Sequence, residues 1–208
     1  MVTRSERYDL LAQLLDYPQV GGYPEALSRC IEMLEDGYAE SAALLRPLHD
    51  HVREMNDGQI QELYTRTFDI NAVCSLEIGW HIYGEDYARG ALLVKMREQL
   101  RLVNVKESCE LPDHLTHVLL LIGRLDGEEA DELAARYLLP GLEKMLEGMV
   151  ADEQPYRALI ETVSKVLRTD HDVKIVVPRQ PHGQPPDWKN RMPAFGSQRC
   201  GGAEGSKR

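Results

Sequence analysis

The chain has 208 residues, a formal net charge of −10 and 43% hydrophobic residues, which fits one domain with a buried core plus additional segments. Charge is unevenly distributed. Residues 171–208 carry seven Lys and Arg against three Asp and Glu, which leaves 17 against 31, a net −14, for residues 1–170. A body this acidic repels nucleic acid and anionic lipid, and it suits a basic peptide partner.

No apolar run approaches the roughly 20 residues of a membrane span. The N-terminal sequence lacks the basic region, apolar core and cleavage site of a signal peptide. The four Cys residues are far apart and form no CxxC pair. We therefore expect a cytoplasmic protein with reduced thiols and no membrane insertion.

Helical periodicity dominates the first third of the chain. It predicts helices over Arg4–Asp16, 24–36, 38–55 and 56–69. Pro47 should break or kink the third of these helices. Asn56 and Gln59 have the spacing of a capping box at the start of the fourth.

Residues 70–84 have no clear period, and a helical pattern resumes at Glu85. This helix carries apolar residues on two nearly opposite sides, namely Tyr87, Ala91 and Val94 on one and Leu93, Met96 and Leu100 on the other. A helix that is apolar on two sides is usually packed between neighbours, so we expect it to be the central helix. The linker over 101–110 is a plausible hinge for exchange of helices between copies.

In the second half, helices are predicted over 112–122, 130–138, 142–149 and 155–167. Residues 126–129 read as a cap and turn, and Pro140 should break or kink the run around it. The only β-like run, 173–177, is short and isolated. The sequence therefore predicts an all-α fold, with a single domain of about seven to nine helices over 1–170. The basic, Pro- and Gly-rich tail over 171–208 is expected to be disordered.

Two histidines on one predicted helix could belong to a metal site or a catalytic site. His114 and His117 lie one turn apart with Cys109 nearby, but a metal site needs three or four converging ligands. Surface or helix-capping histidines are the simpler interpretation. Asp113 and His114 could act as acid and base, or Asp113 could simply favour the helix dipole in a first turn.

Trp80, His81 and Tyr83 are either core aromatics or one wall of a peptide-binding site. The sequence has no nucleophile motif and no phosphate-binding glycine loop. We therefore expect a binding protein rather than an enzyme, with no cofactor and no metal.

Four segments, in order and register, resemble the nitrate reductase delta subunit (NarJ-type) family of molybdoenzyme assembly chaperones. They are Leu14–Pro18, Leu63–Asp69, Tyr83–Leu93 and Glu110–Leu115. This family is related to the chaperones of trimethylamine-oxide and dimethyl-sulfoxide reductases. The resemblance implies an all-helical, non-catalytic chaperone that binds the N-terminal segment of a molybdoenzyme catalytic subunit until the molybdenum cofactor is inserted. A stable structural subunit or adaptor is the alternative.

By motif match, the resemblance implies a peptide site formed by Asp113, His114, Glu110, Trp80 and Tyr83. Tyr83 stands where the family commonly has His, which leaves the identity of the client open. We expect the Trp80–Tyr83 turn to face the helix start at Asp113 and to select the client. The expected oligomeric state is a monomer or a weak, helix-swapped dimer.

Overall fold

A computed structural model describes residues 2–150 and 154–176. Within these ranges the fold is all-α, as the sequence predicts, and the one β-type contact is an isolated bridge between Glu77 and His114. The α-helices are α1 (Arg4–Leu14), α2 (Tyr23–Glu35), α3 (Ala39–Val52), α4 (Asp57–Tyr64), α5 (Ile78–Tyr83), α6 (Tyr87–Leu102), α7 (Leu115–Ile122), α8 (Gly127–Leu133), α9 (Leu139–Gly148) and α10 (Arg157–Asp170). Shorter turns are the π-helical η1 (Thr65–Asp69) and η3 (Ala134–Leu138) and the 3₁₀ turn η2 (Ala72–Cys74). None of the described helices is both long and apolar enough to span a bilayer.

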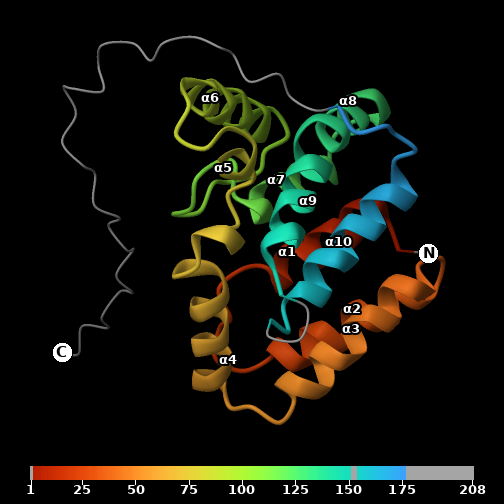
Figure 1. The fold of residues 1–208 in the computed structure, drawn as a ribbon. Helices are drawn as coiled ribbons and strands as arrows, with labels where there is room; N and C mark the ends of the chain where they lie inside the picture. Colours follow the sequence, from red (N-terminus) through yellow and green to blue (C-terminus); the bar gives the residue numbers. More distant parts are fainter. Residues whose placement is uncertain (1, 151–153, 177–208) are drawn as a thin grey trace, which may run out of the picture.

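In the bundle, α7 packs against α1 and α6, and the other helices continue the packing from these two (Figure 1). On one side, α1 packs on α7 and on α2, α2 pairs with α3, and α3 packs on α10. On the other, α10 packs on α9, α9 on α5, and α6 covers α5 and α7. Every residue of α7 except Leu120 is buried. The helix buried on all sides is therefore α7, and its nearly continuous apolar sequence is what such burial requires.

The prediction that the helix after Glu85 is central was wrong. The observed helix, α6, lies at the edge of the bundle and buries only one face, formed by Leu92, Met96 and Leu100. Tyr87 and Val94, on the second predicted stripe, are exposed. Periodicity placed Met96 and Leu100 on one stripe correctly, but it assigned Leu93 to that stripe in place of Leu92. It also could not show that only one of the two stripes has a neighbour.

The two internal prolines do not end their helices. Pro47 lies inside α3, which continues to Val52 and buries Leu48 and Val52 beyond the proline. Pro140 lies near the start of α9, directly after η3, so the helical chain runs from Gly127 to Gly148. A π turn widens the helix before the proline, which lets the chain continue despite the missing N–H.

After α10 the chain stays packed against the domain as far as Val176. The His171 Nδ1 lies 2.6 Å from an Asp131 carboxylate oxygen, and the Val176 N–H donates to the Ala135 carbonyl at 3.0 Å. The remainder of the predicted tail, from 177 onward, lies outside the described residues.

Candidate peptide-binding face

A short pairing of two segments brings the aperiodic stretch to the start of α7. The Ile78 N–H donates to the Asp113 carbonyl at 2.9 Å, and the Leu115 N–H donates to the Leu76 carbonyl at 2.8 Å. This antiparallel contact lies between the residues that precede α5 and those that precede α7. Two segments that are far apart in sequence, and both part of the predicted site, are thereby adjacent.

Asp113 is completely buried, and its carboxylate forms an ion pair with Arg89 of α6. The Arg89 Nε lies 3.0 Å from Oδ2, and its Nη2 lies 3.4 Å from Oδ1. The carboxylate also lies against Gly79, where a Cβ would come within 2.5 Å of Oδ2. Burial raises the pKa of Asp113, while Arg89 opposes that rise. Asp113 therefore links α6 to the start of α7 beneath the surface. It precedes α7, so it does not lie in the first turn of the helix, as one interpretation of the sequence had it.

The two histidines serve the backbone around α7. His114 is the N-cap, and its Nδ1 lies 2.7 Å from the Thr116 hydroxyl. Burial lowers the pKa of His114 to about 4, so the ring is neutral at pH 7. His117 donates from Nδ1 to the Leu111 carbonyl at 2.9 Å and accepts the Ser108 N–H at Nε2 at 3.0 Å. The capping interpretation of His114 is confirmed, although the side chain is buried rather than on the surface.

No cluster of metal-binding side chains surrounds these histidines within the described part of the chain. Both ring nitrogens of His117 already bond to the preceding loop. Across the described ranges, no group of three or more His, Cys, Asp or Glu side chains could hold a metal ion.

Glu110 belongs to a group of four carboxylates contributed by separate parts of the chain. We call this group the acidic face; it comprises Asp16 after α1, Asp69 at the end of η1, Glu77 before α5 and Glu110 before α7. Burial raises the pKa of Glu110, and the negative charges of the other three raise it further. Three of these charges also act on the Tyr64 hydroxyl: burial raises its pKa, and Asp69, Asp16 and Glu110 raise it further. The four carboxylates thus form a region of concentrated negative potential.

Exposed apolar side chains accompany the acidic face. Tyr17, Ile70 and Leu111 each follow one of its carboxylates in sequence, and each is exposed. Tyr17 packs edge-on against Tyr64, with ring centroids 5.5 Å apart. The face therefore combines negative charge with apolar contact area, which are the two features that bind a basic, partly apolar peptide.

Two buried tyrosines hold the end of α1 in this position. The Tyr64 hydroxyl donates to the Leu15 carbonyl at 2.9 Å, and the Tyr23 hydroxyl donates to the Leu14 carbonyl at 2.9 Å. Both hydroxyls donate to backbone carbonyls that lack a partner within the helix at its C-terminus. Tyr64 also packs against Phe68 and Tyr156. The Leu14–Pro18 and Leu63–Asp69 segments therefore meet through this aromatic cluster.

Trp80 and Tyr83 lie on α5, so the predicted turn is a short helix. Both side chains are half-buried. Trp80 lies beside Arg89, whose guanidinium is 5.8 Å from the ring centroid, so its link to Asp113 passes through that arginine. Burial raises the pKa of Tyr83, and Tyr137 of η3 raises it further.

The structure thus brings the predicted residues together only in part. His114 forms the bridge to Glu77, and the charge of Glu77 acts on Glu110. Asp113, next to His114, is buried and paired with Arg89. Within the described ranges, no hydrogen bond, ion pair or ring contact joins Tyr83 to Glu110, Asp113 or His114. Sequence reasoning missed Asp16, Asp69 and Glu77, although each lies in or beside a segment already singled out, because nothing local shows that distant carboxylates converge.

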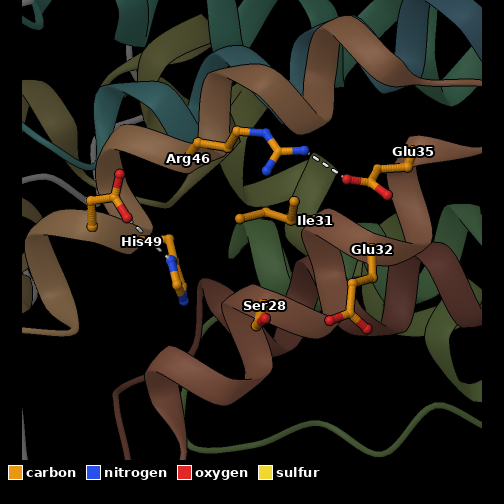
Figure 2. A pocket seen from close by; sticks show the side chains of 7 residues that line it. Ser28, Ile31, Glu32, Glu35, Arg46 and His49 are labelled. Atoms are coloured by element: carbon orange, nitrogen blue, oxygen red, sulfur yellow. Dashed lines mark hydrogen bonds and ion pairs between the residues drawn. The ribbon is translucent and has the colours of Figure 1, made fainter.

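A separate hollow of about 320 Å³ lies between α2 and α3, lined by Ser28, Ile31, Glu32, Glu35, Arg46, His49 and Asp50. Figure 2 shows the Arg46–Glu35 ion pair, 2.6 Å long, on one side of this hollow and Ser28 on the other. It contains none of the predicted site residues. Its shallow, charged lining offers little apolar surface to a ligand.

Comparisons with known proteins support the assignment of a family. A search of curated proteins found no match. A family model described as "Nitrate reductase delta subunit" matches residues 34–159, which include Asp69, Glu77 and the Glu110–His114 segment. The match covers more than half of the chain. The chain therefore belongs to the nitrate reductase delta subunit family.

Proposed function

We propose that this protein is a cytoplasmic, non-catalytic assembly chaperone for a molybdoenzyme, and that it binds the N-terminal segment of the catalytic subunit on the acidic face. Family membership supports association with a nitrate reductase catalytic subunit. The convergence of Asp16, Asp69, Glu77 and Glu110 is the observation that carries the choice of surface.

The chemistry of the face matches a basic segment with apolar anchors. The charges of Asp16, Asp69 and Glu77 raise the pKa of Glu110, which shows that the four carboxylates repel one another. A bound cation would relieve this repulsion, and binding of a basic peptide is therefore favoured. Tyr17, Ile70 and Leu111 provide contact area without rearrangement of the core. In this proposal Asp113, His114 and Trp80 position the surface. Among the five site residues predicted from sequence, Glu110 is the one whose charge contacts the peptide.

A chaperone must release its client, so we expect micromolar affinity, roughly −8 kcal/mol. The test is calorimetric titration of the full chain with a peptide of the cognate subunit's N-terminus, at low and high salt. The test variant carries Asp16→Asn, Asp69→Asn, Glu77→Gln and Glu110→Gln. We expect at least tenfold weaker binding and a reduced salt dependence.

The matched control neutralises four acids on α2, on and just after α3, and on α8, Glu32→Gln, Asp50→Asn, Glu54→Gln and Glu129→Gln, and it changes the net charge equally. Wild-type affinity in this control, with loss in the test variant, would locate the site. Equal loss in both would show that only overall charge matters. Absence of binding by the folded wild-type chain would refute the chaperone proposal, and stable co-purification with active holoenzyme would favour a structural subunit.

A further inference from the structure

The outward face of α6 carries an apolar stripe with no neighbour in the bundle. Tyr87, Val94 and Leu102 are 64%, 57% and 74% exposed, while Leu92 and Met96 on the opposite face are buried. The three exposed residues recur after seven and eight positions, so they lie along one side of the helix. Figure 1 shows α6 at the edge of the bundle. The exposure of the three side chains shows that they point away from it. Glu98 lies between Val94 and Leu102 on the same side, so the stripe is apolar from Tyr87 to Val94 and again at Leu102. Exposed apolar side chains aligned on one side of a surface helix indicate an interaction site.

We propose that this stripe binds the same stripe of a second copy of the chain, with the two α6 helices antiparallel. We call the stripe the α6 seam; it comprises Tyr87, Gly90, Ala91, Val94 and Leu102. In this arrangement the twofold axis passes beside Val94, and the two Val94 side chains meet across it.

The middle of the seam is shaped for close approach of two helices. Gly90 and Ala91 are both exposed, and a Cβ built at Gly90 would meet no atom within 4 Å. Small residues at this point let the partner helix approach to the roughly 8–10 Å of packed helix pairs. With Val94 on the axis, Gly90 lies opposite the partner's Glu98, whose aliphatic stem can pack across it.

Charge favours a second copy in the antiparallel direction. Glu85 and Asp86 are exposed at the N-terminal end of α6, and Arg101 is exposed at the C-terminal end. Arg101 has no ion-pair partner within the described ranges. Antiparallel pairing places the partner's Arg101 beside Tyr87 and the two acids, where ion pairing and cation–π contact are both available. A parallel pair would place like charges together, and a basic peptide would meet Arg101.

The size of the seam implies a weak dimer. A helix of 16 residues is about 24 Å long. One such face buries less than the roughly 1,600 Å² of a standard stable interface. We therefore expect association that depends on concentration, with dissociation in the micromolar range or weaker.

Sedimentation equilibrium of the full chain, from low micromolar to several hundred micromolar concentration, provides the first test. Val94→Asp should raise the dissociation constant at least about a hundredfold, because each copy loses a buried valine and places a carboxylate against its twin. The matched control is Val20→Asp, the same change at a valine that is 78% exposed in a turn away from α6. This control should associate like the wild type.

A charge exchange tests the direction of the pairing. Glu85→Arg and Arg101→Glu should each weaken association, and the double variant should restore it. Within one chain the two positions lie about 24 Å apart along the helix, so the rescue can act only between copies. A wild-type chain that stays monomeric at every concentration would overturn the proposal. So would a Val94→Asp variant that associates normally, or a double variant no tighter than the singles.

Discussion

Arg89→Met should destabilise the fold by stranding the buried carboxylate of Asp113. The Asp113 side chain is 0% exposed, and that of Arg89 is 19% exposed. Removal of one partner of a buried ion pair costs about 3–5 kcal/mol, because the remaining charge is left without compensation. Asp113 can escape this cost only by taking up a proton. From its ordinary pKa of 3.8, protonation costs about 4 kcal/mol at pH 7 and under about 2 kcal/mol at pH 5.

The loss in the Arg89→Met variant should therefore be about 3 kcal/mol at pH 7 and about 1 kcal/mol at pH 5. The sign follows from the pKa of Asp113, which burial raises above its unfolded value, so that the folded variant binds a proton more readily than the unfolded chain. Its stability relative to wild type should thus increase as the pH falls. Urea unfolding followed by far-ultraviolet circular dichroism at both pH values measures this difference.

Two further variants make the test specific. Arg124→Met removes an arginine that pairs with Asp9 through two contacts at the surface, at 2.6 and 3.0 Å, and should cost under about 1 kcal/mol. Asp113→Asn in the Arg89→Met background removes the stranded charge and should recover most of the loss. An Arg89→Met variant as stable as wild type at pH 7, or one whose deficit is the same at pH 5, would refute the reasoning.

Two other predictions concern the same region. Gly79→Ala should lower the free energy of unfolding in urea by about 2–3 kcal/mol, because the new Cβ would come within 2.5 Å of the Asp113 carboxylate. The control, Gly90→Ala in open space on α6, should be neutral or slightly stabilising. Equal behaviour of the two variants would contradict the observed packing. Because burial lowers the pKa of His114 from 6.5 to about 4, unfolding takes up a proton below pH 6.5, so up to about 3 kcal/mol of stability should be lost between pH 6.5 and 4. His114→Asn keeps a capping side chain and should remove this part of the pH dependence; an unchanged pH profile would show that His114 is not its source.

Local signals predicted local structure well. The capping box from Asn56 to Gln59 is present as expected. Asp126, in the predicted cap and turn, is the N-cap of α8, although its side chain accepts no capping hydrogen bond. Each of these signals depends only on a few neighbouring residues, because a cap pairs the backbone groups of its own helix turn. The same locality limited the prediction at Pro140, which allowed either a break or a kink: the helical chain continues there through a π turn directly before the proline.

The candidate site was predictable only as separate segments. The resemblance pointed to Glu110, Asp113 and His114, and the structure places all three at the start of α7. It did not show that Asp113 and His114 are buried, because burial depends on α6 and on the bridge to Glu77. A carboxylate at a helix start looks the same in sequence whether it faces water or an arginine.

The sequence alone determined the helical class, the helix caps and the family segments, since helical period and capping are properties of short stretches of chain. Tertiary structure alone decided which stripe of α6 is buried, which helix is buried on all sides, and that Asp16, Asp69, Glu77 and Glu110 share one face. The physical reason is that burial and electrostatic coupling depend on distances between residues up to 94 positions apart, as from Asp16 to Glu110. Only the packed bundle sets those distances.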